Sequence, residues 1–220
     1  MKLYRYLNST SAIKTIETRS LRVGRILEFN DPFEWQLGIR GLPPQCEEET
    51  YRAIQDWLEY SNAVAGIVCF SAKCKEPLLW AHYADRHRGI VLEFDYDKAS
   101  KSLEKMTYSK NRVVLDIPNY ELPHFTQEQF VPLAKKMVTQ KSLGWKYEKE
   151  YRLHVNLNDC DVHSGSFFLG IPDDTLRRVI RGYRCDVENL YLRRLLDKVD
   201  LNDVEIVDAK ISQSTYQIVC

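Results

Sequence analysis

An alternating run of aromatic, β-branched and charged side chains occupies residues 145–155, Trp145-Lys146-Tyr147-Glu148-Lys149-Glu150-Tyr151-Arg152-Leu153-His154-Val155. This alternation predicts a β-strand, in which successive side chains point to opposite faces. One face then carries polar groups about 6–7 Å apart, namely Glu148, Glu150, Arg152 and His154. Such a row can carry chemistry, and the alternative is a solvated strand face with Glu150–Arg152 charge pairing.

Length and composition predict one soluble globular domain that spans residues 1–220. The chain is 44% hydrophobic and 28% charged, which is typical of a protein with a buried core. Its formal net charge is zero, so binding to nucleic acid or to a membrane would need a local patch. The longest apolar run, Ala63 to Phe70, is too short to span a bilayer. We therefore expect no membrane association and a cytoplasmic location.

The six cysteines are scattered along the chain, at positions 46, 69, 74, 160, 185 and 220. None of them forms a Cys-x-x-Cys pair, which argues against a zinc site and against a disulfide framework. Reduced thiols in a cytoplasm are the simplest interpretation.

Hydrophobic periodicity predicts many short strands with helices between some of them, and no regular βαβ alternation. That order is α+β. The expected helices are a short one after residues 8–10, then 47–60, one from Pro77, 97–103, 130–142 and 186–196. The expected strands are 3–6, 20–23, 65–71, 89–94, 106–109, 145–155, 166–169, 176–181, 204–209 and 216–219. Asn30-Asp31-Pro32-Phe33-Glu34 predicts a tight turn, and residues 110–129 a long surface loop.

Four motifs occur in order along nearly the whole chain. They are Asn30-Asp31-Pro32-Phe33-Glu34, Cys69-Phe70-Ser71, Trp80-x-x-Tyr83-x-x-x-His87-x-Gly89 and Tyr147-Glu148-x-Glu150-Tyr151-Arg152. Together they resemble a bacterial family of domains of unknown function. That resemblance implies a family context, such as phage defence or a toxin, but it brings little biochemistry.

A remoter resemblance, to the arginine–serine–glutamate type of ADP-ribosyltransferase, rests on three positions. Arg5 lies on an early strand, Ser71 ends a central strand, and Glu148-x-Glu150 lies on a late strand. The resemblance implies a split, strongly bent sheet with flanking helices, and NAD as the substrate. It also implies that Arg5 contacts the dinucleotide phosphates, that Ser71 lies by the nicotinamide ribose, that Glu150 is catalytic and that Glu148 positions the acceptor.

The chemistry of the residues suits cleavage of the bond between nicotinamide and ribose. That cleavage builds an oxocarbenium-like cation, which a carboxylate on a rigid strand stabilises. Arg152 is a second candidate for the pyrophosphate, and Tyr83 or Trp80 could stack on the nicotinamide ring. Tyr4 completes the expected cofactor-binding set. Each assignment has a structural alternative: Trp80 and Tyr83 could be core residues, and Ser71 could be a strand-end hydroxyl that binds backbone.

Two other function classes stay open. One is a non-enzymatic module that binds a nucleotide or nucleic acid through the same cleft. The other is a metal-dependent hydrolase that uses His82, His87 and Glu148, although a bound metal is not the leading expectation. The local basic run Arg177, Arg178 and Arg181 is either a solvated face or a platform for phosphates. The acceptor, protein or nucleic acid, and the oligomeric state are open.

Overall fold

The computed structural model describes residues 1–42, 44–96, 102–116 and 127–220. The α-helices are α1 (Ser9–Thr18), α2 (Glu47–Val64), α3 (Pro77–Tyr83), α4 (Gln127–Thr139) and α5 (Asn189–Lys198). The first eight strands are β1 (Lys2–Leu7), β2 (Ser20–Arg25), β3 (Gly38–Arg40), β4 (Ala65–Ser71), β5 (Ile90–Asp95), β6 (Leu103–Lys105), β7 (Thr107–Ser109) and β8 (Val114–Asp116). The other strands are β9 (Gln140–Ser142), β10 (Glu150–Asn156), β11 (Asp161–His163), β12 (Ser166–Gly170), β13 (Leu176–Arg181), β14 (Glu205–Asp208), β15 (Lys210–Ile211) and β16 (Ile218–Val219). The fold is therefore mixed α+β, as predicted.

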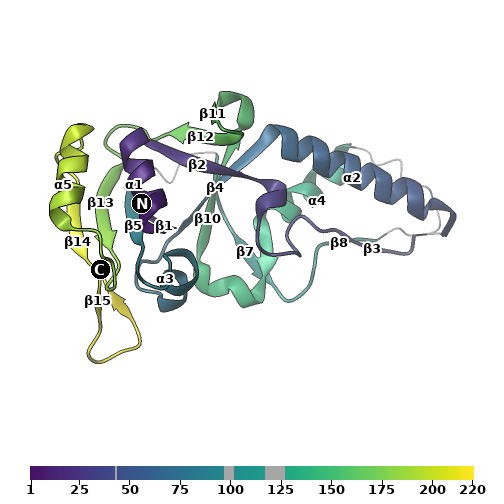
Figure 1. The fold of residues 1–220 in the computed structure, drawn as a ribbon. Helices are drawn as coiled ribbons and strands as arrows, with labels where there is room; N and C mark the ends of the chain where they lie inside the picture. Colours follow the sequence, from purple (N-terminus) through teal and green to yellow (C-terminus); the bar gives the residue numbers. More distant parts are fainter. Residues whose placement is uncertain (43, 97–101, 117–126) are drawn as a thin grey trace.

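One large mixed sheet organises the described part of the chain. Its order is β11-β12-β2-β4-β1-β5-β13-β14, with β10 beside β4 and β6 beside β10. Nearly all of these pairs are antiparallel, and β13 with β14 is parallel. Figure 1 shows α5 and β14 at one end of the molecule and α2, α4, β3 and β8 extending from the other.

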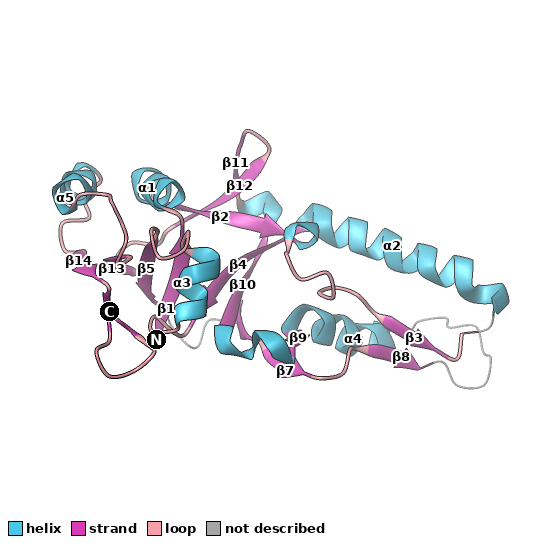
Figure 2. Ribbon diagram, turned by 60° about the horizontal axis from the view of Figure 1, so that its bottom comes forward, coloured by secondary structure: helices cyan, strands magenta, loops and turns pink. Residues whose placement is uncertain are grey.

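Helices cover both faces of the sheet (Figure 2). On one face, Ala12 and Ile16 of α1 and three leucines of α5 pack with Leu3, Phe70 and Phe94 in the main core. On the other face, Leu79 and Trp80 of α3 pack on Tyr4 and Tyr6. Burial of these apolar side chains on both faces is the dominant stabilising contribution.

The structure corrects several predicted boundaries. The strand expected over 145–155 begins only at Glu150, because residues Leu143–Glu148 form a 3-10 helix, η4, which Lys149 ends in a left-handed conformation with φ of 46°. The helix expected over 130–142 ends at Thr139 and is followed by β9. The loop expected over 110–129 contains β8, and its residues 117–126 lie outside the described ranges. The expected helix 97–103 lies almost wholly outside them, and Leu103 begins β6.

The prediction of six reduced cysteines is wrong for two of them. Cys74 and Cys220, which are 146 positions apart, form a disulfide. Cys46, Cys69 and the remaining two cysteines are free thiols. The pairing joins the loop before α3 to the end of β16, where Ile218 N–H also donates to the Lys75 carbonyl. Sequence spacing carries no sign of such a tertiary contact. Across the described residues, none of the helices has both the length and the apolarity needed for a bilayer crossing.

Candidate functional site: a forked sheet with a buried ionic cluster

The sheet forks along one edge of β4. The other edge of β4 is paired with β10 along its whole length, from Glu150 opposite Ser71 to Asn156 opposite Ala65. On the forked edge, β2 pairs with the first half of β4, through Ile67 and Gly66. The end of the same edge pairs with β1, where Tyr4 is opposite Ser71. A Cβ atom on Gly66 would lie 2.4 Å from a Val23 methyl group, so the close approach of β2 requires glycine there.

The Arg5 side chain occupies the gap between β1 and β2. Its Nη1 donates to the Cys69 carbonyl at 2.7 Å, and its Nη2 donates to the Arg22 carbonyl at 3.2 Å. The Cys69 carbonyl belongs to β4 and the Arg22 carbonyl to β2, and both lie where β1 and β2 diverge. The guanidinium therefore provides hydrogen bonds that a neighbouring strand would otherwise provide. Burial lowers the pKa of Arg5. Because a guanidinium has five N–H donors, Arg5 retains donors for a ligand.

A cleft of about 370 Å³ opens at this fork. Tyr4, Ser71 and Glu150 border it from three adjacent strands, because Ser71 is opposite both Tyr4 and Glu150. Directly opposed residues of antiparallel strands point to the same face. Most of the residues predicted to bind NAD or to act on it line the cleft: Tyr4, Arg5, Ser71, Tyr83, Glu148 and Glu150. The exceptions are Arg152, which lies behind the cleft, and Trp80, the alternative candidate for the nicotinamide ring.

Ser71 binds the backbone of the turn that precedes β10. Its hydroxyl donates to the Glu148 carbonyl and accepts from the Lys73 N–H at 3.0 Å. The side chain is buried, with 5% of its surface exposed. Ser71 therefore ties the end of β4 to η4, which is the structural alternative raised from its sequence position, and this contact helps hold Glu148 beside the cleft.

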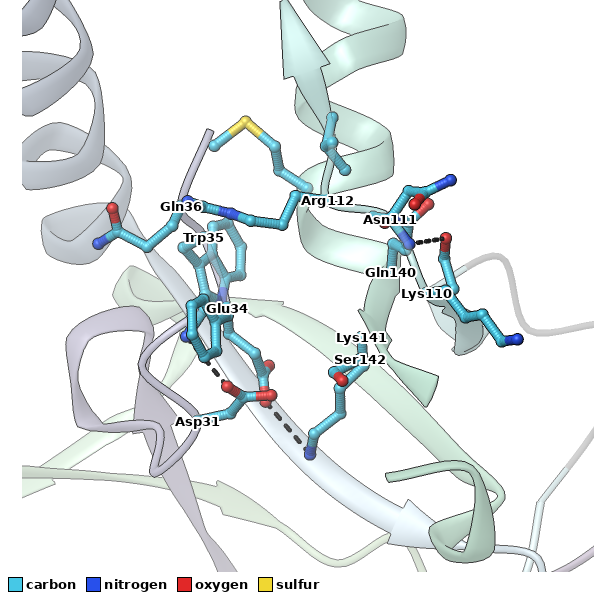
Figure 3. Close-up of a pocket in the computed structure, with 14 residues that line it drawn as sticks. Asp31, Glu34, Trp35, Gln36, Lys110, Asn111, Arg112, Gln140, Lys141 and Ser142 are labelled. Carbon is cyan, nitrogen blue, oxygen red and sulfur yellow. Dashed lines mark hydrogen bonds and ion pairs between the residues drawn. The ribbon is translucent and has the colours of Figure 1, made fainter. Parts of the chain in front are cut away.

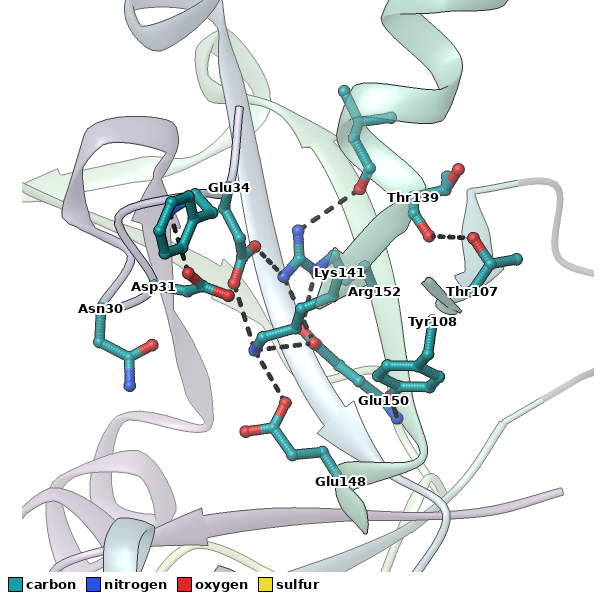
Figure 4. A network of polar contacts seen from close by, with 12 residues as sticks. Asn30, Asp31, Glu34, Thr107, Tyr108, Thr139, Lys141, Glu148, Glu150 and Arg152 are labelled. Carbon is teal, nitrogen blue, oxygen red and sulfur yellow. Dashed lines mark hydrogen bonds and ion pairs between the residues drawn. The ribbon is translucent and has the colours of Figure 1, made fainter. Parts of the chain in front are cut away.

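Five buried charged side chains form an ionic cluster along one wall of the cleft (Figure 4). Lys141 Nζ lies 2.8 Å from Glu148, 3.2 Å from Glu34 and 3.4 Å from Glu150. Arg152 Nε donates to Glu150 at 2.7 Å, and its Nη2 donates to Glu34. We call these residues the ionic cluster: Glu34, Lys141, Glu148, Glu150 and Arg152. Three carboxylates here face two cations, so the fully ionised cluster is negative.

The two carboxylates of the cleft titrate in opposite directions. Burial raises the pKa of Glu148 by more than the neighbouring Lys141 lowers it. Burial also opposes the ionisation of Glu150, but Arg152 and Lys141 outweigh it, and the pKa of Glu150 is lowered. Glu150 is thus held ionised, whereas Glu148 binds a proton more readily. Environments that separate the pKa values of two carboxyl groups are typical of acid–base pairs in active sites.

Tyr83 closes one side of the cleft. Its hydroxyl donates to Glu148 Oε1 at 2.6 Å, and the Asn30 amide donates to that hydroxyl at 3.5 Å. Burial, followed by the hydrogen bond to Glu148, raises the pKa of Tyr83. Trp80, one helical turn earlier, is fully buried and donates its indole N–H to the Cys74 carbonyl at 2.7 Å. In α3, Trp80 is therefore a core residue and Tyr83 faces the cleft.

The other candidate residues lie elsewhere. On β13, which is separated from β4 by β5 and β1, Arg178 pairs with the buried Glu93 and Arg181 pairs with Asp208 at 2.6 Å. Arg177 is exposed on the same strand. His87 stacks against Trp80 with ring centroids 6.4 Å apart, whereas His82 is exposed. Over the described residues, no group of three histidine, cysteine or acidic side chains has metal-binding geometry.

Sequence reasoning missed the residue at the centre of the ionic cluster. The sequence predicts that Lys141 lies within a helix over 130–142, whereas it lies on β9, so the local pattern gives no sign that its charge is buried. The sequence predicts for Glu34 only a place in a turn motif. Cys69 also borders the cleft, and burial raises the pKa of its thiol to about 12, which keeps it protonated at neutral pH.

The comparisons with known proteins bear on this region of the chain. Residues 79–153 match the sequence profile of a family described as "Protein of unknown function (DUF2971)". This match includes most of α3 and four members of the ionic cluster, and it supports the resemblance to a domain of unknown function. No curated protein and no solved structure matched the chain.

Proposed function

We propose that the protein cleaves the bond between nicotinamide and ribose in NAD and transfers ADP-ribose to an acceptor or to water. The observation that carries this proposal is the convergence of Arg5, Ser71 and Glu150, from three different strands, on one cleft. The same residue types occur in the same chain order in the ADP-ribosyltransferases that the sequence resembles. The fork in the sheet further supports a split sheet of that kind.

Glu150 has the properties needed to stabilise the reacting sugar. As the C1′–N bond breaks, its electron pair leaves with nicotinamide and positive charge develops on the ribose. Glu150 is fixed by Arg152 and Lys141, and its lowered pKa keeps it anionic. A charge already oriented toward the developing cation stabilises the transition state without reorganisation.

Glu148 and Arg5 complete the proposed mechanism. The raised pKa of Glu148 suits a group that takes the proton of the attacking acceptor as its oxygen or nitrogen bonds to C1′. Arg5, with donors beyond its two backbone hydrogen bonds, binds the pyrophosphate. Tyr83, half-buried beside Glu148, lies against the nicotinamide ring.

The test is nicotinamide release by the purified protein and by the variant Glu150→Gln. Gln keeps the size of the side chain and removes its charge, so turnover should fall by roughly 100-fold or more, while NAD affinity changes little. The matched variant Glu148→Gln should retain NAD hydrolysis and lose transfer to an acceptor. Thermal melts check that both variants are folded. If Glu150→Gln releases nicotinamide as fast as the parent, the catalytic assignment is wrong.

A second candidate function is a module that binds NAD or another nucleotide without cleaving it. The observation in its favour is that both Glu150 oxygens are engaged, Oε1 with Arg152 and Oε2 with Arg152 and Lys141. A carboxylate held in this way reaches the sugar only if the ionic cluster rearranges. NAD binding by the folded parent protein without nicotinamide release would favour this module over the enzyme.

A further inference from the structure

A second cavity, of about 240 Å³, lies on the other side of the ionic cluster from the cleft. Figure 3 shows Asp31, Glu34 and Trp35 on one side of it and Lys110, Asn111 and Gln140 on the other. Lys141 borders both cavities. The motif Asn30-Asp31-Pro32-Phe33-Glu34 thus divides its residues: Asn30 lines the cleft, whereas Asp31, Phe33 and Glu34 line this second cavity.

Within the described residues, three buried polar atoms at this cavity have no hydrogen-bond partner: Asp31 Oδ2, Trp35 Nε1 and Glu34 Oε1. Of these, Glu34 Oε1 still forms an ion pair with Lys141. Asp31 is 4% exposed and Trp35 is 5% exposed. The other Asp31 oxygen, Oδ1, already accepts from the Phe33 N–H at 3.0 Å. A buried polar group without a partner destabilises the folded protein. A ligand that donates to Asp31 and accepts from Trp35 would remove that destabilisation. Trp35 also has a φ of 61°, which is rare for a bulky residue.

The mouth of the cavity is cationic and aromatic. Phe33 is 60% exposed, and the Arg112 guanidinium lies over its ring at 5.6 Å. Lys110 and Arg112 are exposed and make no ion pair with any residue in the described ranges. Exposed cations beside an aromatic face are suited to an anionic group attached to a flat ring.

We propose that this second cavity binds a nucleotide. The base donates an N–H to Asp31 Oδ2 and accepts from Trp35 Nε1, which any nucleobase edge can do. The phosphate lies at the mouth, where Lys110 and Arg112 supply charge-assisted hydrogen bonds. The ligand is a free mononucleotide or the phosphorylated end of a nucleic-acid strand, which present the same chemistry. This inference does not depend on NAD cleavage in the first cleft.

The test is calorimetric titration of the full-length protein with each of the four nucleoside monophosphates and with a 5′-phosphorylated tetranucleotide. Arg112→Gln, an exposed change, should weaken binding by about tenfold or more, as loss of a charged hydrogen bond does. Trp35→Phe keeps the aromatic ring and removes one donor, so it should weaken binding by about 3–10-fold. Arg194→Gln, on the exposed face of α5, is the matched control and should bind like the parent.

The outcomes separate the two cavities and the two ligand sources. Tight binding of the mononucleotides identifies a free nucleotide, and binding of the tetranucleotide alone identifies a strand end; both support the proposal. Tyr83→Phe, which changes the first cleft, should leave nucleotide affinity unaltered. If Tyr83→Phe weakens binding and Arg112→Gln does not, the nucleotide lies in the first cleft and the proposal is wrong. Absence of binding by the folded parent overturns it as well.

Discussion

At the scale of single residues, the ionic cluster is held together by Lys141, which contacts all three carboxylates. Its burial opposes the charged state, but the surrounding carboxylates outweigh that effect and its pKa is raised. A buried charge whose partner is removed is strongly destabilising. Because the pKa of Glu148 is raised and that of Glu150 is lowered, their contributions to the free energy of unfolding should depend on pH in opposite ways.

We expect Glu150→Gln to lower the free energy of unfolding by about 3–5 kcal/mol at pH 7, as breaking a buried pair does. Because the folded-state pKa of Glu150 is lowered, its contribution is present above the ordinary glutamate value of about 4.3. That contribution is lost as the pH falls through the folded pKa. The stability gap between parent and variant should therefore narrow in acid.

Glu148→Gln should show the opposite trend. The raised pKa of Glu148 means that the parent gains stability from it below about pH 4.3 and loses it as the pH rises through the folded value. Urea unfolding of the parent and both variants between pH 3 and 8 measures both gaps. Gaps that move in the same direction with pH would contradict the assignment of the two environments.

At the scale of elements, α3 helps to shape the cleft, because it buries Trp80 in the core and directs Tyr83 toward the cleft. Pro77 starts the helix at a position where proline is tolerated, and the Glu76 side chain accepts from the Leu78 N–H. Trp80 packs edge-to-face against Tyr6, with ring centroids 5.4 Å apart. The same helix thereby carries Tyr83 to Glu148. Packing of Trp80 is thus expected to control the stability of this face.

Trp80→Ala should lower the free energy of unfolding by about 3–5 kcal/mol, because it deletes a large, fully buried side chain and leaves a cavity. His82→Ala on the same helix is the control: His82 is exposed, so its removal should change stability by about 0.5 kcal/mol or less. Denaturant unfolding monitored by circular dichroism distinguishes the two. Equal losses would show that the helix face has been assigned incorrectly.

At the scale of the whole molecule, the Cys74–Cys220 disulfide ties the last strand to the loop before α3. This cross-link lies close to Trp80, whose indole donates to the Cys74 carbonyl. A disulfide stabilises mainly by restricting the unfolded chain, and long closed loops gain the most in that model. The reduced protein should therefore be less stable even though its core residues are unchanged.

We expect Cys220→Ser to lower the free energy of unfolding by about 2–4 kcal/mol under oxidising conditions, and a reductant to bring the parent to the same value. Cys160→Ser, which removes a free thiol, is the control and should leave the response to reductant intact. Thiol titration of the unfolded, unreduced parent should find four reactive groups, matching the four free cysteines. Six reactive groups would show that the pairing does not form.

Patterns in adjacent residues suffice to predict the α+β class, the central buried strand that ends in Ser71, and the grouping of Glu150 with Arg152 on one strand face. These features depend on local periodicity, which is written in adjacent residues. The turn at Asp31 was likewise predictable, because its side chain binds its own backbone through the Phe33 N–H. The prediction of one shared site depends on chain order and on the resemblance to ADP-ribosyltransferases. Its residues are Arg5, Ser71, Tyr83, Glu148 and Glu150.

The surroundings of those residues depend on tertiary contacts. Lys141 is buried because the chain folds back from β9 to place it beside Glu148 and Glu150, and because Glu34 reaches it from a distant turn. No local pattern records these contacts. Glu148 precedes β10 because Lys149 takes a left-handed conformation, which the alternation of side chains concealed. The fork at Arg5 and the disulfide at Cys220 likewise join segments far apart in the chain. The free energy of such contacts depends on burial and on partners, and both arise only when the sheet has assembled.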